Sequence, residues 1–340
     1  MRTAIRTMLK TGATLLAVSM LAGAAAAEDT TKLKFAVFSP DTEITVKTVF
    51  MPFVEAVNGE KAGVEIEFFP NGALGRNPAQ QAQMVLDGVA DLALVVPSYT
   101  PGRFQENQVF ELPGLFTDLT EATLTYTSLV QSGKIKGYED FVPIAMVTTA
   151  PYSIHTNSPI ASLSDLNGKK IRSTGAIEGE VLKAFGAAPI GMPITEVPEA
   201  IGRKTIDGTT AHPSALFDWG IVKVTSDHYF TRLGIVPLAV LMNRQKFESL
   251  PKPAQDAITK YAGDWIAKTY IASIGAYNAS LVEKLKADPA HTAVFPPQAD
   301  IDAVQPTFDK VIDTWASASP RNKELLDAVR EEVAAVRAKQ

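Results

Sequence analysis

The chain contains no cysteine among its 340 residues. This absence excludes disulfide bonds, a lipid-bearing cysteine anchor and zinc sites built from thiolates. Histidine is scarce as well, and its occurrences are scattered along the chain without an H-E-x-x-H motif (His155, His212, His228 and His291). We therefore expect no structural zinc site and no cofactor, and the sequence leaves open whether a metal ion assists binding.

Several catalytic signatures are also missing. The sequence has no G-x-S-x-G nucleophile elbow, no G-x-x-x-x-G-K-[ST] phosphate loop and no G-x-G-x-x-G after a strand. Together these absences argue against a hydrolase, an NTPase and a dehydrogenase. A pair of carboxylates suited to glycoside hydrolysis stays open, because Asp and Glu are plentiful and their spacing in space is not given by the sequence.

Long hydrophobic runs are lacking except near the start of the chain. Three basic residues there precede an apolar run from Ala13 to Ala22, which is too short to cross a bilayer as a helix. Ala25 and Ala27 fit the small-x-small cleavage pattern, so we expect a signal peptide over residues 1–27 and cleavage before Glu28. The expected location is the bacterial periplasm.

Length and charge indicate the number of domains and the kind of partner the protein can bind. A chain of 340 residues is about twice the usual domain length, which favours two domains. The formal net charge of -5 makes a nucleic acid an unfavourable partner. It leaves room for an anionic ligand, because a cleft can carry local positive charge of its own.

The order of elements predicts an α/β fold. Residues 33–38, 64–69 and 90–96 read as buried or alternating strands, with helices expected over 44–57 and 78–86 between them. Strand, helix, strand is the opening of a doubly wound sheet. A similar unit recurs around residues 195–210, and residues 236–243 read as a strand that crosses back to the first lobe. Helices are expected over most of the chain from residue 253 onward.

One stretch places an arginine where ligands bind. Residues 162–168 read as a capped turn that Gly168 ends in a left-handed conformation, and residues 170–173 follow as a strand. Arg172 then stands near the carboxyl end of that strand, before a helix expected over residues 177–185. Open α/β sheets bind ligands at this edge, and the guanidinium fork matches a carboxylate. A structural or surface salt bridge remains the alternative for Arg172.

Several motifs follow one another in the order of a known family. The first half carries FPNGALG at 69–75, GVAD at 88–91, YTPGRF at 99–104 and LPGLF at 112–116. The second half carries PIASLSDLNGKKIR at 159–172, FGAAP at 185–189 and IDG at 206–208. With these motifs the chain resembles the periplasmic substrate-binding proteins of TRAP transporters, of the DctP type, over nearly all of its length after the signal peptide.

The resemblance implies a two-lobe α/β periplasmic-binding-protein fold, with a ligand cleft between the lobes and helices around the outside. Residues 28–150 with about 238–280 would form the first lobe, and 151–237 with about 281–340 the second. Such a protein binds an organic acid and delivers it to the membrane subunits of an ion-gradient-driven transporter, without catalysis. The family's carboxylate-binding arginine falls on Arg172. A periplasmic enzyme on the same scaffold, or a subunit that presents ligand to a sensor, remains an alternative.

Other expected ligand contacts rest on the same resemblance. Tyr152 stands where members often carry a second polar or cationic residue, and Arg76 lies in a loop that often contacts ligand. Polar or aromatic contacts are expected after residue 208, and aromatic residues at two strand ends face the cleft (His212, Ser214, Phe217, Trp219, Phe38 and Tyr99). Such a pocket would favour a monocarboxylate with an apolar or aromatic body. Lys204 replaces a family glycine, so we expect that helix to end differently.

Overall fold

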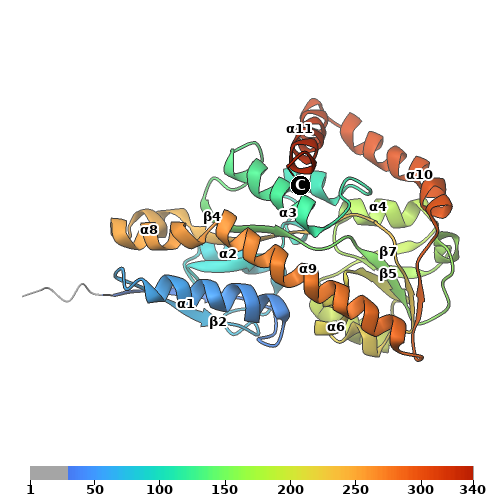
Figure 1. The fold of residues 1–340 in the computed structure, drawn as a ribbon, viewed down its shortest axis with the longest axis horizontal. Helices are drawn as coiled ribbons and strands as arrows, with labels where there is room; N and C mark the ends of the chain where they lie inside the picture. The colour runs from blue at the N-terminus through green and yellow to red at the C-terminus, as the bar shows by residue number, and fades with distance from the viewer. Residues whose placement is uncertain (1–29, 340) are drawn as a thin grey trace, which may run out of the picture. The chain divides into compact units, whose positions relative to one another are not determined.

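The computed structural model describes residues 30–339, so the predicted signal peptide lies outside the described residues. These residues form two sheets (Figure 1). The first sheet has the strand order β2-β1-β3-β10-β4. Its strands are β1 (Thr31–Ala36), β2 (Val64–Phe69), β3 (Leu92–Val95), β4 (Phe141–Thr148) and β10 (Pro237–Asn243). β1 runs parallel to β2 and β3, whereas β10 runs antiparallel to β3 and β4.

The second sheet has the order β11-β9-β5-β8-β6-β7. Its strands are β5 (Ser153–Thr156), β6 (Lys170–Ser173), β7 (Ala188–Gly191), β8 (Gly208–Ala211), β9 (Asp227–Tyr229) and β11 (Thr292–Val294). β6 runs parallel to β7 and β8, while β5 runs antiparallel to β8 and β9. Two α/β lobes, each built on one mixed sheet, confirm the predicted fold class.

Helices cover both sheets. They are α1 (Met51–Gly59), α2 (Gln81–Leu86), α3 (Leu119–Gln131), α4 (Ala176–Ala184), α5 (Val197–Gly202), α6 (Pro213–Asp218), α7 (Arg244–Glu248), α8 (Lys252–Tyr261), α9 (Asp264–Ala287), α10 (Gln298–Ser317) and α11 (Pro320–Arg337). None of the helices within 30–339 is both long and apolar enough to cross a membrane.

Alternation along the strands builds the core of the first lobe. In β1, Leu33 and Phe35 pack toward α1 and α9, whereas Ala36 packs on the opposite face with α2, α3 and α11. Successive strand side chains point to opposite faces, so a sheet that is covered on both sides needs apolar residues at successive positions. This explains why β3, β4 and β10 read as nearly continuous apolar runs, whereas β1 and β2, at one side of the sheet, alternate apolar residues with Lys or Glu.

Two chain segments cross between the sheets side by side. The first joins β4 to β5, and the second returns from β9 to β10, as the sequence predicted for residues 236–243. The segments hydrogen-bond to each other: the amide of Thr149 donates to the carbonyl of Val236, and that of Tyr152 to the carbonyl of Gly234, each over 2.9 Å. This paired crossing is the natural place for a hinge between the lobes.

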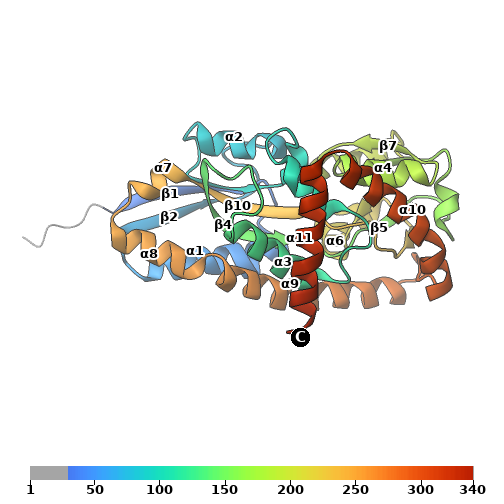
Figure 2. The same cartoon turned by 90° about the horizontal axis from the view of Figure 1, so that it is seen from above.

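The long helices also connect the lobes. α9 contacts β4 beside the first sheet and both α6 and β11 beside the second. Figure 1 shows α9, in orange, passing from α8 to α6. α10 packs on α4 of the second lobe, but α11 packs on α3 of the first (Figure 2). The sequence assigned about residues 281–340 to the second lobe, and the lobe boundaries stay a prediction.

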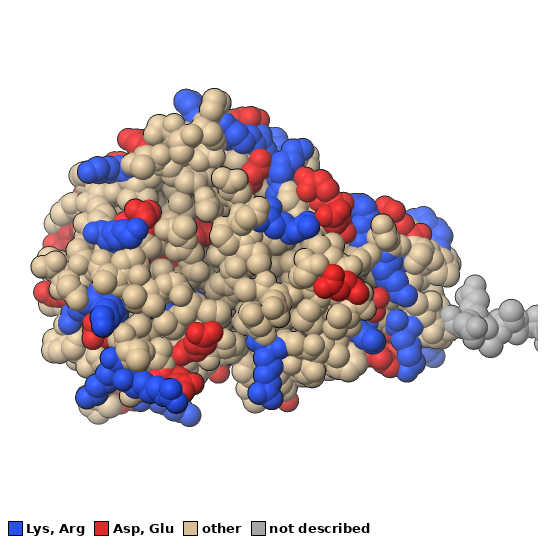
Figure 3. Space-filling model, turned by 180° about the vertical axis from the view of Figure 1, so that it is seen from behind, with Lys and Arg blue, Asp and Glu red and all other residues tan. Residues whose placement is uncertain are grey.

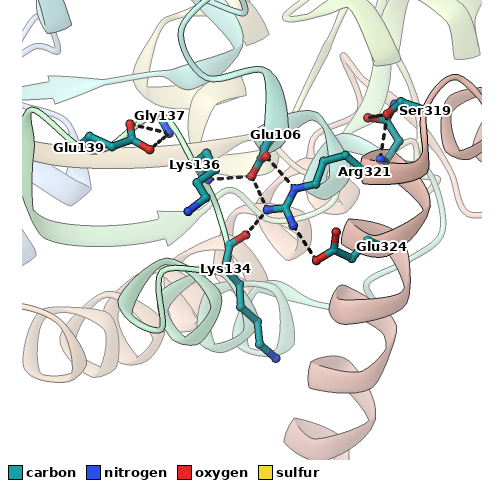
Figure 4. Close-up of polar contacts among 9 residues, drawn as sticks. Glu106, Lys134, Lys136, Gly137, Glu139, Ser319, Arg321 and Glu324 are labelled. Carbon is teal, nitrogen blue, oxygen red and sulfur yellow. Dashed lines mark hydrogen bonds and ion pairs between the residues drawn. The ribbon is translucent and has the colours of Figure 1, made fainter.

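Ion pairs fix α11 at both of its ends. At its start, Arg321 binds both carboxylate oxygens of Glu106 over 2.8 and 2.9 Å (Figure 4). At its end, Arg337 binds both oxygens of the buried Glu121 over 2.9 and 2.8 Å. Bidentate arginine–carboxylate pairs are stronger and more directional than single contacts. They hold α11 against the first lobe. The apolar face of α11 alone would not determine which lobe the helix packs on.

Charges are mixed over the surface drawn in Figure 3. Lysine and arginine side chains alternate there with aspartate and glutamate around broad uncharged areas. This face therefore offers no continuous basic surface to a nucleic acid backbone.

Two helix ends adopt the same left-handed conformation with different residues. Gly88 has φ +71° after α2, and Lys204 has φ +58° after α5. Each is followed by the same backbone closure, from Val89 to Met84 and from Thr205 to Ala200, over 3.0 Å. The expectation that Lys204 would end its helix differently was wrong. Lys204 adopts the left-handed backbone conformation that glycine usually occupies at such a position.

We predict that Lys204→Gly raises the free energy of unfolding by about 0.5–1 kcal/mol, because the side chain no longer opposes the left-handed conformation. The reciprocal Gly88→Lys should lower it by a similar amount, since an added Cβ at Gly88 meets no atom within 4 Å. Urea unfolding of the two variants measures both values. An unchanged or lower stability for Lys204→Gly would contradict the prediction.

Candidate functional site

A cavity of about 50 Å³ lies between the two lobes. The first lobe supplies residues that follow the carboxyl ends of β1 and β3, among them Phe38, Glu43 and Tyr99. The second lobe supplies residues beyond β6 and β8, among them Thr174 and His212. Carboxyl ends of parallel strands from two lobes therefore meet around one small space, which is the ligand-binding edge of open α/β sheets.

The predicted site residues divide into three groups. Five of them line the cavity: Phe38, Tyr99, Tyr152, His212 and Trp219. Arg172 lies directly behind the lining and is bound to Tyr99. The other three do not line the cavity and stay predictions without support from its geometry: Arg76, Ser214 and Phe217.

Each of these three has a different environment. Arg76 is exposed in the loop after β2. Phe217 carries the ammonium nitrogen of Lys284 5.2 Å from its ring centre. Ser214 is bound through its backbone amide to Asn278 over 2.8 Å, and its hydroxyl lies 2.9 Å from Nδ1 of His212. The Ser214 hydroxyl therefore contacts the ring of a residue that lines the cavity without lining it itself.

Arg172 is a buried cation. The strand β6 carries it into the interior, where its side chain is 0% exposed. As predicted, Gly168 ends the preceding turn with φ +76°, and Ser162 and Asp165 form a capping box at the start of that turn. This local structure sets the register that turns Arg172 toward the cleft while its neighbour Ile171 packs in the core.

The guanidinium of Arg172 has only neutral partners. Nε donates to the carbonyl of Met192 over 2.9 Å, Nη1 to that of Thr210 over 3.4 Å, and Nη2 to the hydroxyl of Tyr99 over 3.2 Å. Within residues 30–339 no carboxylate oxygen comes within 4.0 Å of it. A guanidinium carries five N–H donors, so donors remain for a further group. A buried charge without a counter-charge is costly to the fold.

Tyr99 joins the two lobes at this point. It lies in the helical turn η3 (Pro97–Tyr99) after β3 of the first lobe. Its hydroxyl accepts hydrogen bonds from Arg172 and, over 3.0 Å, from the backbone amide of Ile194, both in the second lobe. A single hydroxyl therefore couples the position of the first lobe to the guanidinium.

Burial shifts the titratable groups near Arg172 toward their neutral forms. Burial raises the pKa of the Tyr152 phenol, against the charge of Arg172. Burial, together with the charges of His155 and Arg172, lowers the pKa of His212 to about 3. Burial also raises the pKa of Glu178, although Arg172 opposes this shift. Arg172 therefore places a positive charge directly behind the cavity lining.

Aromatic rings make up a large part of the cavity lining. Phe38 and Trp219, one from each lobe, stack with ring centroids 6.2 Å apart and planes at 30°. Tyr152 and His212 lie 5.5 Å apart at 33°. Apolar side chains complete the lining, among them Leu94, Val96, Ile194, Ala215 and Leu238. The lining is therefore largely aromatic and apolar, with the charge of Arg172 directly behind it.

The lobes touch closely at the start of α4. Glu111, at the end of the helical turn η4 (Gln105–Glu111), is buried and accepts a hydrogen bond from the Ser98 hydroxyl over 2.8 Å. A Cβ added to Gly175 would lie 2.5 Å from Oε2 of Glu111 and 3.3 Å from Cβ of Ser98. Glycine therefore permits this contact between the lobes. Glu111 was not among the residues predicted for the site, although it directly precedes the LPGLF motif.

Three histidines described as scattered form a row in the second sheet. Nδ1 of His155 lies 2.9 Å from Nδ1 of His228, and Nε2 of His228 lies 3.0 Å from Nδ1 of His291. β5, β9 and the loop before β11 bring them together. Sequence separation concealed this contact. In the described part of the chain, no cluster of three or more His, Cys, Asp or Glu has the arrangement of a metal site.

Glu111 predicts a pH dependence of stability. Burial raises the pKa of its carboxyl from 4.5 to about 8, although the Ser98 hydrogen bond opposes the shift. Between pH 4.5 and about pH 8, the folded state therefore retains a proton on Glu111 that unfolding releases. The resulting stability is full below pH 4.5 and declines as the pH rises through about 8, by at most about 1.4 kcal/mol per pH unit.

We predict that Glu111→Gln flattens the decline in the free energy of unfolding between pH 6 and pH 9, because the amide does not titrate. Denaturant unfolding across this range measures the slope, with Glu65→Gln on the surface of β2 as the control. Equal slopes in the wild type and the Glu111 variant would contradict the assignment.

Comparison with known proteins identifies the family. The family model for bacterial extracellular solute-binding protein, family 7 (DctP), matches residues 35–318. The C4-dicarboxylate-binding periplasmic protein DctP of Rhodobacter capsulatus is 26% identical over 202 residues, which cover 58% of this chain and 60% of that protein. The chain thus spans about three fifths of the length of the first two curated relatives that it matches.

Solved structures of similar fold cover a larger share of this chain than the curated relatives do. A TRAP solute-binding protein from Rhodoferax ferrireducens, in complex with copurified benzoate, has a TM-score of 0.83 at 23% identity, covering 91% of this chain and 99% of that one. A marine metagenome TRAP solute-binding protein, specific for aromatic acid ligands and bound to 3-hydroxybenzoate, has a TM-score of 0.80 at 28% identity, covering 90% and 98%. This chain belongs to family 7 of the bacterial extracellular solute-binding proteins, the DctP-type proteins of TRAP transporters.

Proposed function

We propose that this protein binds an organic acid in the cavity between its lobes and delivers it to the membrane subunits of a TRAP transporter in the periplasm. The observation that carries the proposal is the buried guanidinium of Arg172, which has three neutral partners and no carboxylate in the described chain. The carboxylate of a ligand would supply the missing counter-charge. Family members are binding proteins, which favours binding without catalysis.

The lining supports an aromatic or otherwise apolar monocarboxylate. Beyond Arg172, the rings of Phe38 and Trp219 and the neutral Tyr152 and His212 surround the space. A sugar acid would bring several hydroxyls that need partners, which apolar side chains do not provide. The metagenome protein with 28% identity, which bound 3-hydroxybenzoate, agrees with this ligand class.

Binding and closure are coupled in this account. The ligand first pairs with Arg172 on the open second lobe, and the first lobe then rotates about the paired crossing segments. Closure brings the Tyr99 hydroxyl onto Arg172 and the amide of Ile194. It also excludes water, which strengthens the ion pair between Arg172 and the carboxylate. The membrane subunits would recognise the closed arrangement.

We predict that Arg172→Ala lowers affinity for the bound acid by about 2–5 kcal/mol, because a desolvated carboxylate loses its partner. Arg172→Lys should recover only part of the loss, since an ammonium does not provide the planar fork. Titration calorimetry with the tightest binder from a panel of aromatic, keto, hydroxy, dicarboxylic and sugar acids measures the change.

The exposed Arg203→Ala serves as the matched control, since it removes an arginine that pairs with Glu199 on the surface of α5. Arg203→Ala should leave affinity unchanged. Wild-type affinity in a folded Arg172→Ala protein would refute the assignment of Arg172 as the carboxylate partner.

Gly175 tests closure independently of charge. We predict that Gly175→Ala weakens binding by about tenfold, because the added methyl group would collide with Glu111 in the closed form. Small-angle scattering should show less compaction on ligand addition. Gly202→Ala, where an added Cβ meets nothing within 4 Å, is the control. Equal affinity and equal compaction in both variants would show that the contact at Gly175 does not limit closure.

A further inference from the structure

Glu43 places an unassigned carboxyl group in the cavity. It lies in the loop between β1 and the π-helical segment η1 (Val46–Phe50) of the first lobe, and it lines the same space as Tyr152, His212 and Trp219. Its Oε2 atom is shielded from solvent and has no hydrogen-bond partner in the described residues. A buried polar oxygen without a donor destabilises the state that contains it, so a donor from the ligand would complete it.

Glu43 and Arg172 border the cavity through different residues. Arg172 donates to the hydroxyl of the cavity-lining Tyr99 and to the carbonyls of Met192 and Thr210. Glu43 instead precedes Ile44, whose amide donates to Asp218, the neighbour of the cavity-lining Trp219. The aromatic pair of Phe38 and Trp219 belongs to the same lining. A ligand that reaches from Arg172 to Glu43 would therefore carry its second polar group away from its carboxylate.

The carboxylate of the neighbouring Asp218 already accepts hydrogen bonds from the protein. Asp218 accepts hydrogen bonds from the Tyr277 hydroxyl over 2.7 Å and from the backbone amide of Ile44 over 3.2 Å. Of these two acids, Glu43 is thus the one with a buried oxygen that has no partner in the described residues. Burial raises its pKa to about 7; the Ser39 hydroxyl opposes this shift and the charge of Asp218 adds to it.

A neutral hydroxyl fits Glu43 better than a cation does. A carboxyl group that holds a proton for much of the time near neutral pH is a weak partner for an ammonium group. A hydroxyl can donate to Oε2 whether Glu43 is ionised or protonated. It also adds no second charge to a cavity whose lining is largely aromatic and apolar.

We propose that the ligand is a hydroxy-substituted aromatic acid whose hydroxyl, remote from the carboxylate, donates a hydrogen bond to Oε2 of Glu43. This inference rests on the proposed function, because it needs the carboxylate to be bound near Arg172. It assigns Glu43 as the residue that distinguishes the hydroxylated acid from its unsubstituted parent. A site built to accept a hydrogen bond discriminates strongly against an analogue that cannot donate one.

Titration calorimetry with matched acids tests the proposal. The probes are benzoate, 3-hydroxybenzoate, 4-hydroxybenzoate, the two corresponding methoxybenzoates and 3-(aminomethyl)benzoate. We expect the preferred hydroxybenzoate to bind wild-type protein about tenfold or more tightly than benzoate and than its own methoxy analogue. The methoxy group keeps the oxygen but removes the donor.

Variants then assign the preference to Glu43. In Glu43→Leu the ratio between the hydroxybenzoate and benzoate should fall to about one, while benzoate still binds. Glu43→Gln should keep part of the preference, because its amide oxygen still accepts a hydrogen bond. Glu65→Leu makes the same change at an exposed position of β2 and should leave the ratio unchanged.

The outcomes separate this inference from the proposed function. If benzoate binds but hydroxybenzoates bind no better, or if their advantage survives in Glu43→Leu, the role of Glu43 is refuted while carboxylate binding stands. A tighter complex with 3-(aminomethyl)benzoate than with either hydroxybenzoate would also refute it, in favour of a cationic group. If none of the aromatic acids binds, the ligand class of the proposed function fails first.

Discussion

The structure depends on a desolvated cation, Arg172, that forms no ion pair with any carboxylate of residues 30–339. Arg172 is held by two backbone carbonyls and one phenol hydroxyl, all neutral, in an environment that is 0% exposed. Transfer of an unpaired charge into the interior is strongly unfavourable, so a ligand carboxylate would stabilise the closed form selectively. Neutral Tyr152 and His212 keep this positive charge uncompensated, and Tyr99 connects it to the other lobe.

Much of the fold could be predicted because local rules and tertiary packing agree. The strand at residues 170–173 and the left-handed Gly168 appear where the sequence placed them. β11 was missed, because three residues between prolines give little periodic signal and owe their strand conformation to pairing with β9. At Lys204 the hydrogen bonds that close the end of α5 impose a left-handed backbone conformation, although lysine disfavours that conformation.

The site was predictable in part for a similar reason. Strand ends and turn motifs indicated Arg172, Phe38 and Tyr99, because their positions follow from chain order. Glu43 and Glu111 carry no such signal: in the sequence they are acids among many, and only packing shows that their oxygens are buried. The contact of His155 with His228 likewise depends on the pairing of β5 with β9, which sequence separation does not reveal.

The most direct test of the buried cation is a thermal-shift comparison of acids with their neutral isosteres. Purified protein would be heated with benzoate and benzamide, and with further pairs of aromatic acids and their amides, each at the same concentration. A ligand that binds only the folded state raises the melting temperature by mass action. We expect a rise in the melting temperature with at least one acid and none with its amide. Equal shifts with an acid and its amide, or no shift with any acid, would contradict it.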